Sequence, residues 1–176
     1  MRILAVDLRS QRFGVAVLEG QHTLLEWGVK SCPASGDIGL TVQKRLASLA
    51  VFFDPEVIVL THVANHNREA RARLKVTLEA ISQLAQQYSA EVVIVRRDEI
   101  QQVFEKSGNT TKYGIACQVA LHFPELTWKL PPARMNWMKE HYNMTIFDAV
   151  AAGLTYLARL SDIPLATILP ETRTHG

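Results

Sequence analysis

The order of the apolar segments constrains the fold more than any other feature of the sequence. Three runs of strand length, at 3–8, 13–18 and 23–29, follow one another with only short polar connections between them. Connections of this length join antiparallel strands in hairpins. Two later β-branched runs, at 56–61 and 91–95, are separated by a segment with helical periodicity, as in parallel strands joined by a crossover helix. The sequence therefore predicts a three-stranded meander followed by two parallel strands.

Helical periodicity fills much of the remaining chain. Apolar residues recur at helical spacing from Leu40 to Phe53, and Pro55 predicts the end of that helix. A long helix is expected from an N-cap at Asn67 to about Tyr88. The predicted fold class is α/β, a mixed five-stranded sheet with helices on both faces. Further helices are expected at 98–106, 110–123 and 145–160.

Length and composition limit the class of protein. A chain of 176 residues is long enough for one domain, which we expect to span 1–162, with an irregular tail at 163–176. The hydrophobic fraction of 48% and the net charge of +2 argue against a disordered chain. No apolar run approaches the ~18–20 residues of a membrane span, and Asp7 and Arg9 interrupt the first run too early for a signal peptide. The two widely separated cysteines predict reduced thiols in a cytoplasmic protein.

Two aspartates lie in apolar surroundings. Asp7 ends the first apolar run, and Asp148 lies in the first turn of the last expected helix, among small residues such as Ala149 and Gly153. Each has a simple structural explanation, as an edge-facing or helix-capping acid for Asp7 and as an acid stabilised by the helix dipole for Asp148. The small residues also predict close packing of this helix on the sheet, which would bring the two carboxylates together. Such carboxylates repel each other, and a divalent cation relieves the repulsion.

Four stretches of the chain, taken in order, resemble a known family. They are 3–10 with 14–17, 53–63, 103–121 and 147–153. With them the chain resembles the RuvC-type Holliday-junction resolvases of the RNase H-like superfamily, and it is also similar to the YqgF branch. The resemblance implies an RNase H-like fold, catalytic acids at Asp7 and Asp148, and action on branched nucleic acid in DNA recombination and repair.

The resemblance also implies a metal centre, from which this sequence departs. RuvC-type nucleases hold two Mg²⁺ ions with four acids, one ion activating the attacking water and the other stabilising the leaving oxygen. Thr61 and Thr145 occupy two of the four matching positions, and a neutral hydroxyl does not replace a carboxylate around a hard cation. We therefore expect Mg²⁺ or Mn²⁺ to bind weakly or not at all, with Asp7 and Asp148 as the remaining metal ligands.

A third acid would have to complete such a centre. Glu99, just after the fifth strand, is the preferred candidate, because the YqgF branch has an acid at that place. The predicted catalytic set is therefore Asp7, Asp148 and Glu99. Other candidates, each explained more simply as a surface or core residue, are Asp98, His66, Glu140 and His141.

A nucleic-acid surface would have to be locally basic, because the overall charge is only +2. Basic residues cluster beside the first aspartate, along one face of the long helix, and around the hydroxyl-rich segment at 107–111. A solvated helix face is the simpler explanation for the second group, whereas hydroxyl and basic groups together suit phosphate oxygens. The predicted nucleic-acid contacts are Arg9, Arg12, Arg68, Arg71, Lys75, Lys106 and Lys112.

Three aromatic residues near the Pro-rich connection are further candidates for contact with nucleic acid. Trp128, Trp137 and Tyr142 are candidates for base stacking. Packing of these rings beneath the connection is the simpler alternative. The sequence leaves both open.

Two classes of function are consistent with these features. The first is a metal-dependent endonuclease that cleaves branched or structured DNA or RNA. The second, favoured by the two threonines, is a catalytically inactive nucleic-acid-binding or scaffold protein with the same fold. A homodimer is expected from the resemblance, since RuvC-type resolvases pair to cut two strands symmetrically. The superfamily's sugar-kinase and actin-like ATPases are disfavoured, because the chain lacks Gly-rich phosphate loops and a second such domain.

Overall fold

A computed structural model describes residues 1–9, 11–31, 36–61, 68–105, 107–108, 110–135 and 137–161. Five strands form a mixed sheet, and they are β1 (Arg2–Leu8), β2 (Arg12–Glu19), β3 (Thr23–Ser31), β4 (Val57–Thr61) and β5 (Glu91–Val95). Their spatial order is β3-β2-β1-β4-β5. The first three strands pair antiparallel, and β1, β4 and β5 pair parallel. The predicted fold class is confirmed.

Several sequence predictions concern residues outside the described ranges. They include the helix N-cap at Asn67, the candidate ligand His66, the candidate phosphate contact Lys106 and the tail at 163–176. The extent of the domain, 1–162, likewise stays a prediction.

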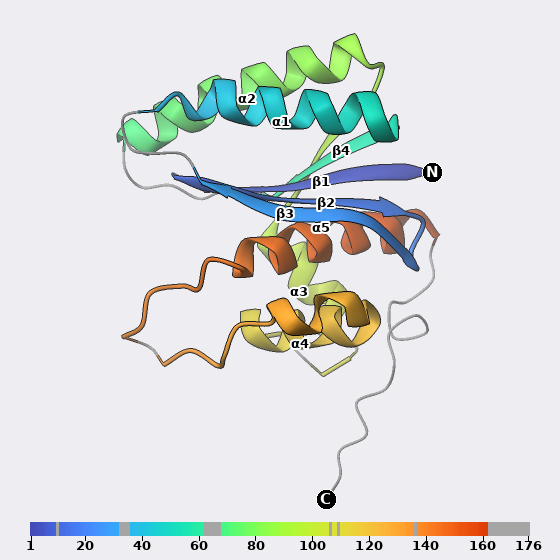
Figure 1. Ribbon diagram of the computed structural model, residues 1–176. Helices are drawn as coiled ribbons and strands as arrows, with labels where there is room; N and C mark the ends of the chain where they lie inside the picture. Colours follow the sequence, from blue (N-terminus) through green and yellow to red (C-terminus); the bar gives the residue numbers. More distant parts are fainter. Residues whose placement is uncertain are drawn as a thin grey trace, which may run out of the picture.

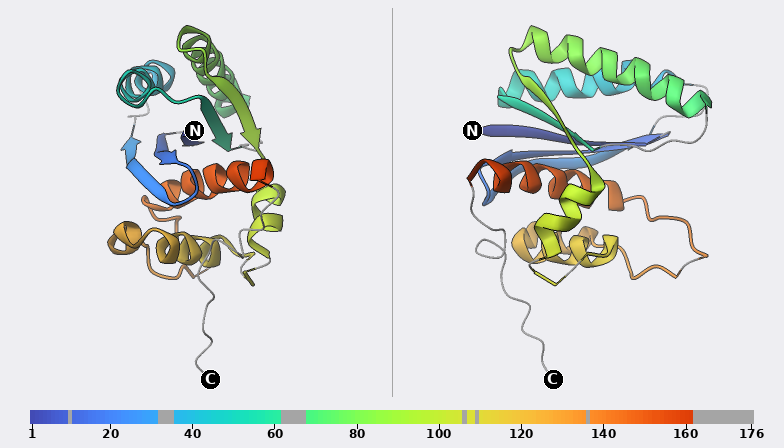
Figure 2. Two further views of the ribbon diagram at one scale, coloured as in Figure 1. Left: turned by 90° about the vertical axis from the view of Figure 1, so that its right-hand side faces the viewer. Right: turned by 180° about the vertical axis from the view of Figure 1, so that it is seen from behind.

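Helices cover both faces of the sheet. They are α1 (Ile38–Phe53), α2 (Arg68–Gln87), α3 (Arg97–Glu105), α4 (Lys112–His122), the 3-10 helix η1 (Pro124–Lys129) and α5 (Met144–Ser161). Helices α1 and α2 lie on one face and α5 on the other (Figure 1). Helices α3 and α4 lie beyond α5, so that α5 is enclosed between them and the sheet (Figure 2). None of the helices in the described ranges combines the length and apolar character needed to cross a membrane.

Each face of the sheet has its own apolar core. Alternate residues of β1 point to opposite faces, so Leu4 and Val6 join the core beneath α1 and α2, whereas Ile3 and Ala5 join the core around α5. This double coverage explains the nearly uninterrupted apolar sequence of β1. By the same alternation Asp7 points to the α5 face.

The fifth strand is not the fully buried strand that its sequence predicts. Strand β5 lies at the edge of the sheet, and Ile94 is 49% exposed. Only β4 pairs with it in the described sheet. A short β-branched run does not distinguish a central strand from an edge strand, because both need one apolar face, and only the pairing order decides which it becomes.

Two glycines allow α5 to lie close to the sheet. A Cβ atom on Gly14 of β2 would lie 2.2 Å from the backbone oxygen of Thr145, and one on Gly153 would lie 2.3 Å from Leu18 Cδ1. Close-packed interiors do not accommodate contacts this short. Gly14 pairs with Asp7 across the β1–β2 ladder. The close approach at Gly14 therefore holds the first turns of α5 beside the end of β1.

Candidate functional site

The buried carboxylate of Asp7 is the centre of the candidate site. Its side chain is only 3% exposed, and both of its oxygens have partners. Thr61, at the end of the neighbouring strand β4, donates its hydroxyl to Oδ1 at 2.6 Å, and Arg9 Nε donates to Oδ2 at 2.8 Å. Parallel strands β1 and β4 end at the same edge of the sheet, which places these three side chains together.

The guanidinium of Arg9 joins Asp7 to Asp148. While its Nε donates to Asp7, its Nη2 donates to Asp148 Oδ2 at 2.7 Å. Lys112, the first residue of α4, places its Nζ 2.8 Å from the same Asp148 oxygen. The two aspartates that the sequence singled out are thus brought together, and the group between them is a cation of the chain itself.

A third carboxylate, Glu140, completes the cluster from the segment before α5. It accepts a hydrogen bond from Lys112 and lies 3.9 Å from Arg9 Nη2 and 3.7 Å from Arg12 Nη2. The three acids Asp7, Asp148 and Glu140 therefore alternate with the three bases Arg9, Arg12 and Lys112. We call these six residues the Arg9 cluster; its formal charges cancel.

The surroundings shift the acids of the cluster in opposite directions. Burial, reinforced by the neighbouring charge of Asp148, raises the pKa of Asp7 to about 6, although Arg9, Thr61 and Lys112 oppose the shift. Partial burial also acts to raise the pKa of Glu140, but the hydrogen bond and charge of Lys112, with Arg9 and Arg12, outweigh it, so that this pKa is lowered. Of these two acids, Asp7 is therefore the one that titrates nearer to neutral pH.

A small cavity opens beside the cluster. It measures about 80 Å³ and is lined by Asp7, Arg9, Thr61, Asp148 and, from the α3 side, Val95, Arg97 and Ile100. Arg97 is exposed, and among the described residues it has no ion pair. Arg97 was not among the residues predicted from the sequence. The signal that would have found it is its position two residues after β5, at the edge where the parallel strands end and ligands commonly bind.

The arrangement of donors does not fit a divalent metal ion. In the described part of the chain, no three His, Cys, Asp or Glu side chains converge closely enough to hold one. The carboxylate oxygens that would ligate it accept hydrogen bonds from Arg9 and Lys112 instead. A hard cation prefers oxygen ligands and would be repelled by these two cations.

Glu99, the predicted third catalytic acid, does not line the cavity. Its Oε2 accepts the backbone N–H of Arg96 at 2.6 Å, and its Oε1 lies 3.1 Å from Arg159 Nη1. Asp98 is exposed and paired with Arg96. A catalytic role for Glu99 would require its carboxylate to leave both partners, and it stays a prediction. Glu140, ranked lower from sequence, is the acid in contact with the cluster.

The other predicted contacts are distributed between two places. Arg9, Arg12 and Lys112 belong to the cluster, and Arg12 Nε is buried without a hydrogen-bond partner in the described structure. Arg68, Arg71 and Lys75 are exposed on α2, and Lys75 Nζ lies 4.0 Å from Glu79. Their contact with nucleic acid stays a prediction.

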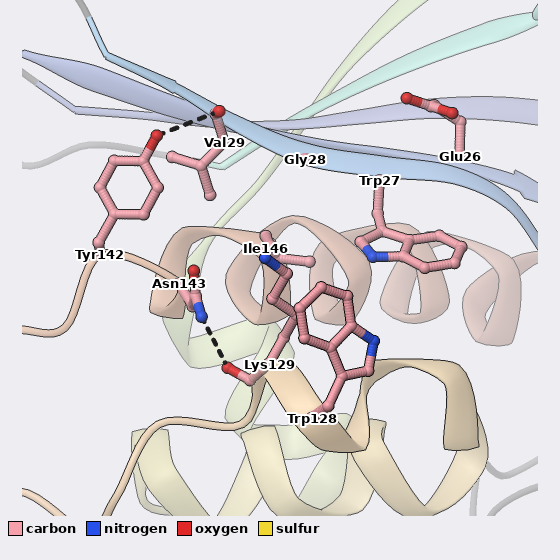
Figure 3. A pocket seen from close by; sticks show the side chains of 9 residues that line it. All are labelled: Glu26, Trp27, Gly28, Val29, Trp128, Lys129, Tyr142, Asn143 and Ile146. Carbon is pink, nitrogen blue, oxygen red and sulfur yellow. Dashed lines mark hydrogen bonds between the residues drawn. The ribbon is translucent and has the colours of Figure 1, made fainter.

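A larger pocket lies two strands away from Asp7 of the cluster, between β3, η1 and the start of α5. It has a volume of about 460 Å³, and its walls include Trp27 of β3 and Trp128 of η1 (Figure 3). Tyr142 also lines it, whereas Trp137, 81% exposed, does not. We call this space the tryptophan pocket. Trp128 is 72% exposed, so it is not packed beneath the Pro-rich connection as the simpler alternative supposed.

Several proteins of known structure share this architecture. No family model and no curated protein sequence matches the chain. Among solved structures, Thermus thermophilus RuvC in complex with a Holliday junction substrate superposes with a TM-score of 0.67 at 16% identity, covering 93% of this chain and 98% of that one. The fold is RuvC-like. The crystal structure of the yeast mitochondrial Holliday junction resolvase gives a TM-score of 0.60 at 13% identity, over 91% of this chain and 82% of that one. The fowlpox virus Holliday junction resolvase gives 0.51 at 14% identity, over 91% and 99%.

Within the RuvC-like fold, the two threonines at positions assigned to acids behave differently. Thr61 faces the site and hydrogen bonds to Asp7. Thr145 is buried, and its hydroxyl donates to the backbone oxygen of Tyr142 at 3.0 Å, away from the carboxylates. The RuvC-like fold therefore keeps two of the expected acids at this edge and surrounds them with basic side chains.

Proposed function

We propose that the protein binds branched or structured nucleic acid, with Arg9, Arg12, Arg97 and Lys112 contacting a backbone phosphate, and that it does not cleave the bound strand. The observation that carries the proposal is the Arg9 guanidinium, hydrogen bonded to Asp7 and Asp148 at once. The cation that balances the two carboxylates belongs to the chain. The resemblance to junction-bound structures supports the choice of ligand.

Loss of cleavage follows from electrostatics. A Mg²⁺ ion entering between Asp7 and Asp148 would have to displace hydrogen bonds from Arg9 and Lys112. Charge-assisted bonds of this kind are among the strongest in proteins. The displaced cations would then remain beside the ion at the cluster, where like charges repel. Metal binding is therefore disfavoured in the resting arrangement.

Binding of phosphate follows from the donors that remain. With Arg97 included, four basic groups face three acids, and the Arg97 head group is exposed in the same cavity. Protonation of Asp7, whose pKa is about 6, would further increase the local positive charge. Side-chain N–H donors of this kind position a nucleic-acid backbone independently of its sequence. Figure 1 shows the N-terminal ends of α2 and α5 at the edge of the sheet where β1 ends, and we propose that the basic residues at the start of α2 extend this surface.

Salt-dependent binding to a four-way junction in EDTA tests the proposal. We expect binding without added metal, and an Arg97→Ala variant whose slope of log affinity against log salt is smaller by about 1, the contribution of one phosphate contact. Lys44→Ala is the matched control, because Lys44 is an exposed cation on α1, across the sheet. Absence of junction binding by the wild type at low salt contradicts the proposal.

A metal-dependent endonuclease is the second candidate. The observation that favours it is the shared partner of the two aspartates, because movement of Arg9 alone would release both carboxylates. The supporting result is cleavage of a junction in Mg²⁺ or Mn²⁺ that Asp7→Asn and Asp148→Asn both abolish. Intact junction with the wild type in both metals excludes this candidate and supports the first.

We also propose that two copies bind one junction, because a four-way junction offers equivalent strands to a symmetric pair. Mass measurement of the protein–junction complex tests this. Two protomers per junction are expected, and one protomer at saturation contradicts the proposal.

A further inference from the structure

We propose that the tryptophan pocket binds one unpaired nucleobase of the strand whose phosphate contacts the Arg9 cluster. This inference deepens the proposed function and rests on it. It assigns the pocket a ligand that the phosphate contacts alone do not require, and it predicts a preference for substrates with unpaired bases.

Two indole rings give the pocket its stacking surfaces. Figure 3 shows Trp27 extending from β3 and Trp128 extending from η1 toward the same space. No ring-to-ring contact joins these two residues among the described aromatic pairs. Trp128 is 72% exposed, so most of its ring surface is open to a ligand. A flat, aromatic ligand would cover this surface.

Hydrogen bonds hold the walls in place before any ligand enters. The Tyr142 hydroxyl donates to the backbone oxygen of Val29 at 3.2 Å, which ties the segment before α5 to β3. The Asn143 side-chain Nδ2 donates to the backbone oxygen of Lys129 at 3.1 Å, which ties the same segment to η1. Both bonds are visible in Figure 3. A preformed pocket loses little conformational entropy on binding.

The polar groups of the pocket suit a base attached to a phosphate backbone. Lys129 Nζ lies 4.0 Å from the centre of the Trp128 ring, so a positive charge accompanies the stacking surface. The carbonyl oxygen of the Asn143 side chain is an acceptor for the edge of a base. Glu26, also in the lining, is paired with Arg45 at 2.8 Å. A volume of about 460 Å³ lies within the range of small-molecule pockets.

The position of the pocket links it to the Arg9 cluster. Asp7, Gly14 and Val29 are paired in one row across β1, β2 and β3. Two strand spacings separate the ends of this row, about 10 Å, which is about three base steps of a B-form strand. Tyr142 and Asn143 in the lining follow Glu140 of the cluster by two and three residues. One nucleic-acid strand therefore reaches both places.

An extended peptide is the competing occupant, because β3 is an edge strand of the sheet. Such a peptide would add to the edge through backbone hydrogen bonds. The Tyr142 hydroxyl already donates to the Val29 oxygen, which is one acceptor on the lining segment of β3. The aromatic walls also favour a flat ring over a peptide backbone. The structure thus favours the base.

The test compares two junctions of equal charge. One carries a short single-stranded gap of adenines, and the other carries abasic residues in the same gap. We expect the wild type to bind the adenine gap more tightly, with quenching of tryptophan fluorescence. In Trp128→Ala the affinity for the adenine gap should fall about 5- to 150-fold, the range of one stacked base, while the affinity for the abasic gap stays the same. Trp128→Phe should retain most of the preference.

Trp137→Ala is the matched control, because Trp137 is even more exposed and lies outside the pocket. Equal binding of the two gaps by the wild type, or an unchanged preference in Trp128→Ala, overturns the inference while the proposed function stands. Failure of the wild type to bind either junction overturns both. Quenching by an extended peptide that competes with the adenine gap identifies the edge of β3 as the binding element and also overturns the inference.

Discussion

The Arg9 cluster and the tryptophan pocket lie on the same face of the sheet, but they differ in whether their side chains pair with one another. The cluster is compact, with a cavity of about 80 Å³ in which acids and bases satisfy one another. The pocket is larger, at about 460 Å³, and leaves an aromatic ring exposed. In the first site the acids and bases pair with one another, whereas the second leaves the Trp128 ring exposed to solvent. The difference shows that side chains gathered on one face of the sheet can either pair with one another or stay open to a partner.

The largest effect is expected from Gly14→Ala, which disturbs both sites. A Cβ atom there would lie 2.2 Å from the backbone oxygen of Thr145 and must push the first turns of α5 outward. Overpacking of this kind costs typically 1–3 kcal/mol, and we expect about 3 kcal/mol because the contact is with backbone. Denaturant unfolding measures the loss. Gly28→Ala is the control, since a Cβ atom on Gly28 meets nothing within 4 Å. Equal stability of the two variants would contradict the close-packing account.

Arg9→Ala breaks the cluster alone. It leaves Asp7 and Asp148 without their common cation, and removing one partner of a buried pair costs about 3–5 kcal/mol. We expect about 2–3 kcal/mol, because the Arg9 side chain is 31% exposed.

The Arg9→Ala variant also tests whether a metal ion can take the place of the Arg9 guanidinium. The melting temperature of the wild type should not respond to Mg²⁺ or Mn²⁺, whereas that of Arg9→Ala should rise with either ion, since Asp7 and Asp148 then lack the cation that bridges them. A wild type that is stabilised by millimolar Mg²⁺ as strongly as the variant would show that Arg9 does not occupy the place of a metal.

The pH dependence of stability tests the burial of Asp7. Its pKa is raised from the usual 3.8 to about 6 in the folded protein, so the folded state binds the proton more tightly than the unfolded state. The contribution of Asp7 to stability is therefore greatest below pH 4 and decreases as pH rises from 4 to 6, by about 2–3 kcal/mol. Comparing Asp7→Asn with the wild type by denaturant unfolding isolates this contribution. A constant difference between the two from pH 4 to 7 would contradict the raised pKa.

The smallest effect is expected on α2, outside both sites. Lys75 is 80% exposed and its Nζ lies 4.0 Å from Glu79, so Lys75→Ala should change the unfolding free energy by less than about 0.5 kcal/mol. If α2 extends the phosphate surface, junction affinity should nevertheless decrease and its salt slope should fall by about 1. Unchanged affinity would confine the nucleic-acid surface to the neighbourhood of the cluster.

Much of the fold was predictable because the strands and helices have strong local patterns. The runs at 3–8 and 56–61 correspond to β1 and β4, and the periodicity ending before Pro55 corresponds to α1. The edge position of β5 was not predictable, since a β-branched run has the same pattern at the centre and at the edge of a sheet. The 3-10 helix η1, which carries Trp128, was not predicted, because its six residues show no helical periodicity.

The candidate site was predictable only where a residue belongs to a regular element. Asp7 and Asp148 were recognisable from the end of a strand and the start of a helix. The contacts of Glu140 and Arg97 were not, because they depend on where a loop and a neighbouring helix are placed by distant parts of the chain. Glu99 was predicted in the site because it follows β5. In the structure, the backbone N–H of Arg96 and the side chain of Arg159 hold its carboxylate outside the cavity.

The sequence by itself determined the order of strands and helices, the burial of β1 and the position of Asp7 near its end. These features depend on apolar periodicity and on turn-forming residues, which act over a few neighbouring residues. Only the tertiary structure decided which charges neutralise Asp7 and Asp148, and that Trp27 and Trp128 border one pocket. Ion pairs and pocket walls join residues far apart in the chain, such as Arg9 and Asp148. Their partners are set by the packing of α5 on the sheet, which no local pattern specifies.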